Sequence, residues 1–153
     1  MNSHFLFEPS AVAIVSAKTK AAILEALADR FADSYDLDAA EVLERLNERE
    51  CLGSTGFGRG VAIPHARVEG LNRPVAALLK LTEPTDFAAA DGMPIDLVFG
   101  LVSPEHSGAT HLYALAALSR LVRDERVHEA LSEAPDTEAL YGLVSNAADR
   151  DAA

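Results

Sequence analysis

The sequence predicts a single α/β domain, and three observations carry that prediction. Short apolar runs, typical of buried strands, occupy residues 11–15, 75–81 and 95–102, and longer amphipathic segments precede and follow them. Strands interleaved with helices of this length indicate a sheet covered by helices. The chain of 153 residues has the length of one domain and shows no linker, repeat or low-complexity tract. We expect one domain over residues 1–153, with its core at about residues 6–146.

The composition is that of a folded protein and argues against several classes of partner. Hydrophobic residues make up 49% of the chain and charged residues 24%. The formal net charge of −11 argues against nonspecific binding to nucleic acid or to an anionic membrane surface. Because Cys51 is the single cysteine, an intramolecular disulfide and a cysteine-pair metal site are excluded. No signal-peptide pattern and no apolar run near the roughly 18 residues of a membrane span occur. We therefore expect a cytoplasmic protein that does not insert into a membrane.

The first third of the chain predicts two helices after the first strand. Ser16 or Thr19 is positioned to cap the first helix. Asp38 and Glu41 have the spacing of a capping-box variant and open the second helix. The apolar side chains that we expect to face the core are Ile23, Leu24, Leu27, Ala28, Phe31, Val42, Leu43 and Leu46.

The last third predicts three helices after the most apolar strand, which we expect at the centre of the sheet. The first of these helices starts at Thr110 and His111. Asp124 caps a short helix, and Asp136 opens the final one. Residues 147–153 are expected to fray. Inward-facing side chains are expected at Leu112, Leu115, Leu118, Leu121, Val122, Val127, Leu131, Leu140, Leu143 and Val144.

The most distinctive stretch is GSTGFGRGVAIPHAR, at residues 53–67. Four of its first eight positions are glycine, which is used where the backbone takes a positive φ or where another group approaches closely. Residues 61–63 have the pattern of a buried strand tip. Pro64 removes a backbone N–H, so we expect the strand to end there and a loop to follow His65. Arg67 follows two residues after His65, and we expect the chain to bring it back toward the pocket beside His65.

Two interpretations of His65 remain open from the pattern alone. It is either a hydrogen-bonded structural histidine at a strand end or a nucleophile, because neutral imidazole has a lone pair available near neutrality. A phosphoryl group on the ring would bring about two negative charges and three acceptor oxygens. Loop N–H groups, arginine side chains and hydroxyls suit such an anion.

The same stretch strongly resembles the phosphorylation-site segment of the fructose/mannitol-type IIA domains of the bacterial phosphoenolpyruvate-dependent phosphotransferase system. The resemblance covers about residues 6–144, and the GSTG opening is most similar to the stand-alone nitrogen-regulatory (PtsN-like) branch. It implies a mixed five-stranded sheet flanked by helices on both faces. It also implies that the histidine of the IPH motif, His65, accepts a phosphoryl group from an HPr-like phosphocarrier, with no metal or dissociable cofactor.

The resemblance assigns roles to further residues. Arg49, near the end of the second predicted helix, and His111, in GATHL, match the family's arginine and second histidine. Both would stabilise charge on the transferred phosphoryl group, and a helix N-terminus at His111 suits an anion. Ser54 and Thr55 would add hydroxyl donors. From spacing alone, Arg49 is better explained as a solvated charge at a helix end, and only the resemblance reverses that interpretation. The alternative for His111 is a space-filling residue of a first turn.

Other chemistries have less support. The loop lacks the Lys-Ser/Thr of a Walker A motif, and no G-x-S-x-G elbow occurs. His65, His106 and His111 could converge on a metal, but His106 and His111 are five residues apart and do not share a helical face. Cys51 is expected to be a small buried apolar residue. The surface histidines expected to have no role are His4 and His128.

Two functions remain compatible with the sequence. The favoured one is a nitrogen-regulatory IIA protein whose phosphorylation state controls partner proteins. The alternative is a transport component that passes the phosphoryl group to a IIB protein. We expect no IIB or membrane domain to be attached, and the loop opens with GSTG; both points favour the regulator. Arg59 stands where relatives often carry asparagine, and this extra cation is expected to affect which phosphocarrier docks.

Overall fold

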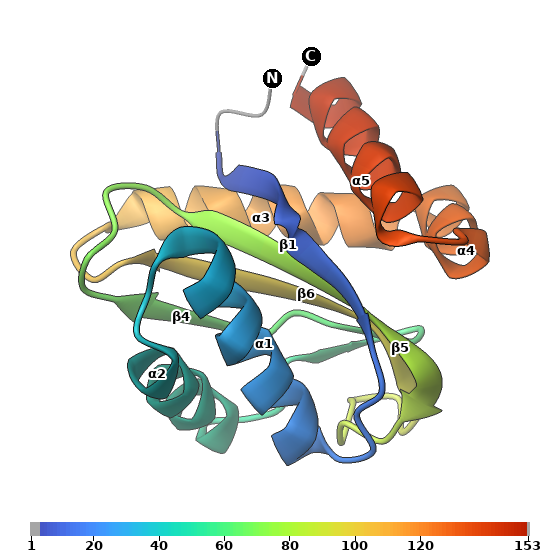
Figure 1. Ribbon diagram of the computed structural model, residues 1–153, viewed down its shortest axis with the longest axis horizontal. Coiled ribbons are helices and arrows are strands. Elements are labelled where there is room, and N and C mark those ends of the chain that lie inside the picture. The colour runs from blue at the N-terminus through green and yellow to red at the C-terminus, as the bar shows by residue number, and fades with distance from the viewer. Residues whose placement is uncertain (1–3, 153) are drawn as a thin grey trace.

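The computed structural model describes residues 4–152 and shows a sheet with helices on both sides (Figure 1). The strands are β1 (Leu6–Val15), β2 (Gly56–Gly58), β3 (Val61–Ala62), β4 (His65–Val68), β5 (Val75–Thr85) and β6 (Ile95–Pro104). The helices are α1 (Lys20–Tyr35), α2 (Ala39–Cys51), α3 (Ala109–Arg123), α4 (Glu125–Glu133) and α5 (Thr137–Ala152). The predicted α/β class is confirmed.

The sheet is mixed and has the order β1-β5-β6-β3-β2, with β4 also paired to β6. β5 and β6 run antiparallel, whereas β1 pairs parallel with β5, and β3 and β4 pair parallel with β6. Val61 lies opposite Leu97 and His65 lies opposite Leu101, so β3 and β4 keep one register along β6. The two short strands are segments of one interrupted strand. The sheet therefore has the five strand positions that were expected, with β6 at the centre.

Pro64 interrupts this strand but does not end it, so the expectation of a loop directly after His65 was wrong. Pro64 has no N–H to donate, yet its carbonyl oxygen accepts from the Leu101 N–H at 3.0 Å, which holds the chain beside β6. β4 then resumes at His65 in the same register. The interruption places His65 at the first position of a strand, where the ladder fixes its backbone.

Two apolar clusters lie on opposite faces of the sheet, because alternate residues of a strand point to opposite sides. Ala77 and Leu79 of β5 pack with α1 and α2, whereas Ala76 and Leu78 pack with α3, α4 and α5. The expected cover of helices on both faces is confirmed. Within the described residues, no helix is both long enough and apolar enough to cross a membrane.

Side-chain caps begin four of the helices at the positions that the sequence predicted. Thr19 caps α1, Asp38 caps α2, Asp124 caps α4 and Asp136 caps α5, each side chain accepting a backbone N–H at 2.8–3.0 Å. α1 ends at Tyr35, whose hydroxyl donates to the Ala76 carbonyl oxygen at 2.6 Å. That hydrogen bond ties the end of α1 to β5.

Two boundaries differ from the sequence prediction. β1 begins at Leu6, earlier than expected, because an irregularity between Phe7 and Val12 breaks the alternation that marks a strand. α5 continues through most of the segment that was expected to fray, and Ala147 is buried against the α3 side of the sheet. Residue 153 of that segment lies outside the described residues.

Leu112 was expected to face the core but is 60% exposed. The register of α3 turns His111 and Ala114 inward instead, and Leu118, Leu121 and Val122 continue that buried face as predicted. Leu112 directly follows the buried His111, and the turn of the helix between successive residues places its side chain outside the buried face of α3. The exposed Leu112 adjoins the candidate site.

Candidate functional site

The glycine-rich loop joins α2 to β3, and its glycines act as the sequence predicted. Gly60 takes a φ of +83°, a conformation that other residues rarely adopt. Gly56 lets the loop pack closely on another segment, because a Cβ there would lie 2.6 Å from the Ala89 Cα. The loop therefore folds tightly beside the start of β4.

Glu50, near the end of α2, fixes the start of the same loop. Its nearly buried carboxylate accepts hydrogen bonds from the Thr55 N–H at 3.0 Å and from the Thr55 hydroxyl, and it pairs with Lys20 Nζ at 2.8 Å. A buried charge is tolerated when it is paired and hydrogen-bonded in this way. We expect this anchor to help set the position of Arg49, one residue earlier.

Glu50→Ala is expected to lower the free energy of unfolding by about 3 kcal/mol, because Lys20 and the Thr55 N–H lose a buried partner. Glu48→Ala, at an exposed position of the same helix, is the matched control. It is expected to change the free energy of unfolding by less than about 0.5 kcal/mol. Urea unfolding followed by circular dichroism measures both variants. Equal stabilities of the two would contradict the anchoring role of Glu50.

His65 is partly buried, and its two ring nitrogens have different partners. Nδ1 lies 2.8 Å from the Ile63 carbonyl oxygen, which only accepts, so the hydrogen-bond pattern assigns the proton to Nδ1. Nε2 accepts from Arg49 Nε at 3.2 Å, so Nε2 holds the lone pair. This is the neutral tautomer with Nε2 as its nucleophilic atom.

Arg49 lies in the last turn of α2, and a second hydrogen bond, from Nη1 to the Gly53 carbonyl oxygen at 2.8 Å, holds it in place. Burial lowers the pKa of His65, the Arg49 charge lowers it further, and the hydrogen bond to Ile63 opposes them in part. The net pKa of His65 lies below the ordinary value. His65 is therefore neutral at pH 7, as a nucleophile must be.

His111 faces His65 from the first turn of α3, with the ring centroids 5.7 Å apart. Its Nδ1 lies 2.6 Å from Ser103 Oγ on β6, and the residue is only 6% exposed. Burial lowers the pKa of His111 to about 4, and the charge of Arg67 and the nearby His65 add to that effect. His111 is therefore uncharged at pH 7 and offers an anion a hydrogen bond instead of a positive charge.

The stability of the chain is expected to fall as the pH is lowered from 7 to 5. Unfolded His111 takes up a proton near pH 6.5, whereas the folded residue does so only near its pKa of about 4. Because the folded-state pKa is depressed, protonation in this window favours the unfolded chain by about 2 kcal/mol. In urea unfolding, the free energy of unfolding of the wild type is expected to fall by about 2 kcal/mol more than that of His111→Gln over this pH range. Equal losses would show that the pKa of His111 is not lowered.

The two hydroxyls expected to bind phosphate have other partners here. Ser54 Oγ donates to the Phe87 carbonyl oxygen at 3.0 Å and accepts the Gly56 N–H at 3.0 Å. The Thr55 hydroxyl donates to Glu50. Both hydroxyls thus brace the loop. Phosphate binding by either stays a prediction, and it would require these hydrogen bonds to break.

Two other residues lie differently from their sequence expectation, and a third, Arg59, forms an ion pair while its effect on docking stays a prediction. Cys51 is exposed instead of buried, because the end of α2 faces solvent there. His128 is partly buried, and its Nε2 lies 3.3 Å from Asp96 Oδ1, so it is not a surface residue without a contact. Arg59 pairs with Glu125 of α4 at 3.1 Å, which engages the charge expected to influence docking.

The three histidines considered as metal ligands do not form a metal site of the expected kind. His65 and His111 come together, whereas His106 is exposed on the loop before α3. Over residues 4–152, no group of three or more histidine, cysteine, aspartate or glutamate side chains is placed to hold a metal ion.

Sequence reasoning missed Ser103 and Glu50. Ser103 is fully buried at the end of β6 and positions the His111 ring. The available signal was a polar residue that directly follows the most apolar strand. Glu50 is one of many acidic residues of α2, so no local pattern distinguished it.

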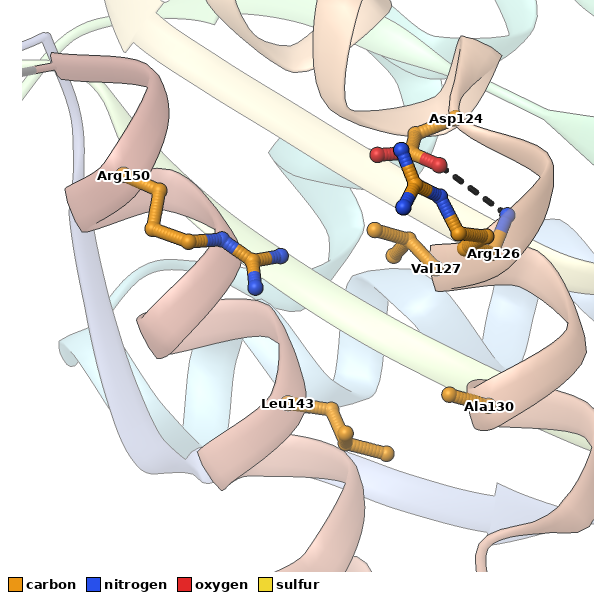
Figure 2. A pocket seen from close by; sticks show the side chains of 6 residues that line it. All are labelled: Asp124, Arg126, Val127, Ala130, Leu143 and Arg150. Atoms are coloured by element: carbon orange, nitrogen blue, oxygen red, sulfur yellow. Dashed lines mark hydrogen bonds between the residues drawn. The ribbon is translucent and has the colours of Figure 1, made fainter.

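A separate pocket of about 430 Å³ lies between α4 and α5 (Figure 2). Its lining consists of Asp124, Arg126, Val127, Ala130, Leu143 and Arg150. The Asp124 carboxylate is occupied as a helix cap, where it accepts the Arg126 N–H at 3.0 Å. The lining holds no histidine or cysteine and shares no residue with the His65 site, so this pocket is not the candidate active site.

Comparison with known proteins identifies the family. Residues 5–147 match the family model described as phosphoenolpyruvate-dependent sugar phosphotransferase system, EIIA 2. A nitrogen regulatory protein of Pseudomonas aeruginosa is 42% identical over 127 residues, which cover 82% of each chain. Another from Bradyrhizobium diazoefficiens is 39% identical and covers 83% of each chain. The fructose-specific EIIA component of Haloferax volcanii is 35% identical and also covers 83% of each.

Solved structures agree with these matches. The nitrogen regulatory protein IIA-Ntr from Neisseria meningitidis gives a TM-score of 0.82 at 32% identity, over 90% of this chain and 95% of that one. The mannitol IIA of Escherichia coli gives 0.76 at 19% identity, over 92% and 99%, which supports the fold alone.

Fold, site and relatives together define a component of the sugar phosphotransferase system, and the chain belongs to its EIIA 2 family. The similarity to the nitrogen-regulatory branch, expected from the GSTG opening, is confirmed by these relatives.

Proposed function

We propose that this chain is a nitrogen-regulatory phosphoryl carrier. It accepts a phosphoryl group from an HPr-like phosphocarrier onto His65, and its phosphorylation state controls partner proteins. The observation that carries the proposal is the state of the His65 ring. Its Nε2 lone pair lies 3.2 Å from Arg49 Nε, while a carbonyl oxygen holds the proton on Nδ1. Membership of the EIIA 2 family supports the same chemistry.

In the transfer, the Nε2 lone pair of His65 forms a bond to phosphorus as the bond between phosphorus and the donor imidazole breaks. The electron pair of the broken bond returns to the donor ring nitrogen, so no proton has to leave either ring. The Nδ1–H keeps its hydrogen bond to the Ile63 carbonyl oxygen. That bond stabilises the positive charge that develops on the His65 ring.

Hydrogen-bond donors surround the place where the phosphoryl oxygens would arrive. Arg49 Nε–H points at Nε2 in the free protein, and we expect it to turn to a phosphoryl oxygen once the lone pair is used. His111 supplies a ring N–H from the opposite ring. The N-terminus of α3 has no side-chain cap. The Thr110 N–H donates to the Ser107 carbonyl oxygen at 3.1 Å, and we expect neighbouring N–H groups of the first turn to be available to an anion. Such donors suit the charge spread over the equatorial oxygens.

The surface beside these residues suits a protein donor. Leu52 is 84% exposed directly after α2, and Leu112 and Tyr113, next to His111, are 60% and 64% exposed. Large exposed apolar side chains that gather near a site mark a protein interaction surface. We therefore propose that the phosphocarrier docks on this face, and that regulatory partners using it compete with the carrier.

A sugar-transport role is the second candidate. The observation that favours it is the fructose-specific EIIA component of Haloferax volcanii, which is 35% identical. In that role the phosphoryl group would pass from His65 to a IIB protein. In the regulatory role the added charge of about −2 would change the affinity of a partner for the docking face.

A two-stage experiment tests the proposal. Phosphorylated HPr-like carriers are mixed with the chain, and intact mass reports the gain of one phosphoryl group. The phosphorylated and free forms are then compared for binding to proteins of a cell extract and for transfer to IIB proteins. A difference in partner affinity is the expected result. Rapid transfer to a IIB protein with identical partner affinities would favour the transport role, and no phosphorylation by any carrier would contradict both.

A further inference from the structure

Arg67 is the charged side chain of β4 that the proposed transfer has not used. Because alternate residues of a strand share a face, Arg67 and His65 lie on the same side of β4. Ser103 of β6 lies opposite Arg67 in the ladder, and Ser103 Oγ lies 2.6 Å from His111 Nδ1. Arg67, Ser103, His111 and His65 therefore form one continuous group.

The Arg67 guanidinium lacks the kind of partner that other arginines of the chain have. Arg30, Arg45 and Arg59 each form an ion pair with a carboxylate. Among the described residues Arg67 forms no such pair, and its Nε is buried without a hydrogen-bond partner. Leaving a buried N–H without an acceptor is costly. An anion at the site would supply the missing acceptor.

The Arg67 charge already acts on the site. It is the second cause, after burial, of the lowered pKa of His111. Arg49 in turn contacts the His65 ring at 3.2 Å. Arg49 thus contacts the His65 ring, and the charge of Arg67 acts on the facing His111 ring, while both rings are uncharged at neutral pH.

We propose that Arg67 binds the phosphoryl group once this group is on His65, as a second guanidinium beside Arg49. The inference rests on the proposed function, because the anion is the phosphohistidine itself. A phosphoryl group carries about two negative charges, and one guanidinium balances only one of them. Arg67 Nε–H gains an acceptor only after transfer. Arg67 therefore favours the phosphorylated state and shifts the transfer equilibrium toward this chain.

The variants Arg67→Gln and Arg67→Lys test this role against Arg59→Gln. Arg59 is a suitable control because it is exposed and already paired with Glu125, and because an effect on carrier docking would change the rate of transfer and not its equilibrium. Intact mass at equilibrium with the carrier gives the fraction of each variant that is phosphorylated. Arg67→Gln is expected to lower the equilibrium constant at least about tenfold, the scale of a hydrogen bond to a charged group. Arg67→Lys is expected to lower it less, and Arg59→Gln by less than about twofold.

A measurement on the unaltered chain removes any dependence on how the variants fold. NMR of the arginine Nε–H groups is recorded for the free and the phosphorylated wild type. The Arg67 signal is expected to shift and to exchange more slowly with water after phosphorylation, and the Arg59 signal is expected to stay in place. An unmoved Arg67 signal, or an unchanged equilibrium in a folded Arg67→Gln variant, would overturn the inference while His65 is still phosphorylated. Failure of the wild type to accept phosphate would instead overturn the proposed function.

Discussion

His65→Ala is expected to accept no phosphoryl group from the carrier that phosphorylates the wild type. The substitution removes the lone pair that lies beside Arg49. Phosphoramidates hydrolyse in acid and survive base, unlike phosphoserine, so the wild-type label is expected to vanish on mild acid treatment. Intact mass before and after acid treatment measures both the extent and the chemical class of the modification.

The matched control for this prediction is His106→Ala, which removes an exposed histidine near the start of α3. It is expected to be phosphorylated like the wild type. Because His65 is only partly buried, its loss is expected to leave the chain folded, which a thermal melt checks. A folded His65→Ala chain that still took up acid-labile phosphate would show that the acceptor has been misplaced.

Arg49→Ala and His111→Ala are each expected to slow phosphoryl transfer by about 10² to 10³, the usual effect of removing one preorganised donor from a transition state. Arg49 donates directly to the reacting nitrogen at 3.2 Å, and the His111 ring faces the His65 ring. Rapid-quench kinetics with the phosphorylated carrier measures the rates. Arg45→Ala is the control, since this arginine of α2 pairs with Glu105.

The pH dependence of the same rates separates the two variants. The Arg49 charge lowers the pKa of His65, so removing it raises that pKa. The rate of Arg49→Ala is therefore expected to begin falling at a higher pH than the wild-type rate as the solution is acidified. Rates within about twofold of wild type for both variants would contradict the assigned roles.

His111 is buried, so its substitution is expected to affect the stability of the chain as well as the rate of transfer. The residue is 6% exposed, because α3 turns it toward β6. His111→Ala is therefore expected to melt at a lower temperature than the wild type, and its rate is best measured well below that transition. His111→Gln, which keeps a polar side chain of similar reach, helps to distinguish a loss of donation from a loss of packing.

The sequence was sufficient for features that local chemistry determines. Thr19, Asp38 and Asp124 cap their helices because short polar side chains reach the free N–H groups of a first turn. The apolar run of β6 forces that strand to the centre of the sheet. The glycine pattern marked the tight loop, and the family resemblance named His65 and its neighbours.

Features that depend on tertiary register were not predictable from one sequence. Pro64 removes one donor, but only the position of β6 shows that the strand continues beyond it. The exposure of Leu112 depends on how α3 is rotated against the sheet. Ser103 matters because it contacts His111, eight residues later in the chain. Glu50 matters because it contacts Thr55, five residues later. Those contacts form only when the strands and helices pack.

The proposed transfer requires that Nε2 of His65 is the atom that receives the phosphoryl group. Nitrogen NMR of the phosphorylated chain, with labelled histidine, identifies that atom, because the ring nitrogen bonded to phosphorus shows a distinct shift and coupling. The structure predicts phosphorus on Nε2 of His65, with the proton still on Nδ1 and bonded to the Ile63 carbonyl oxygen. Phosphorus on Nδ1, or on any other residue of the chain, would refute this assignment.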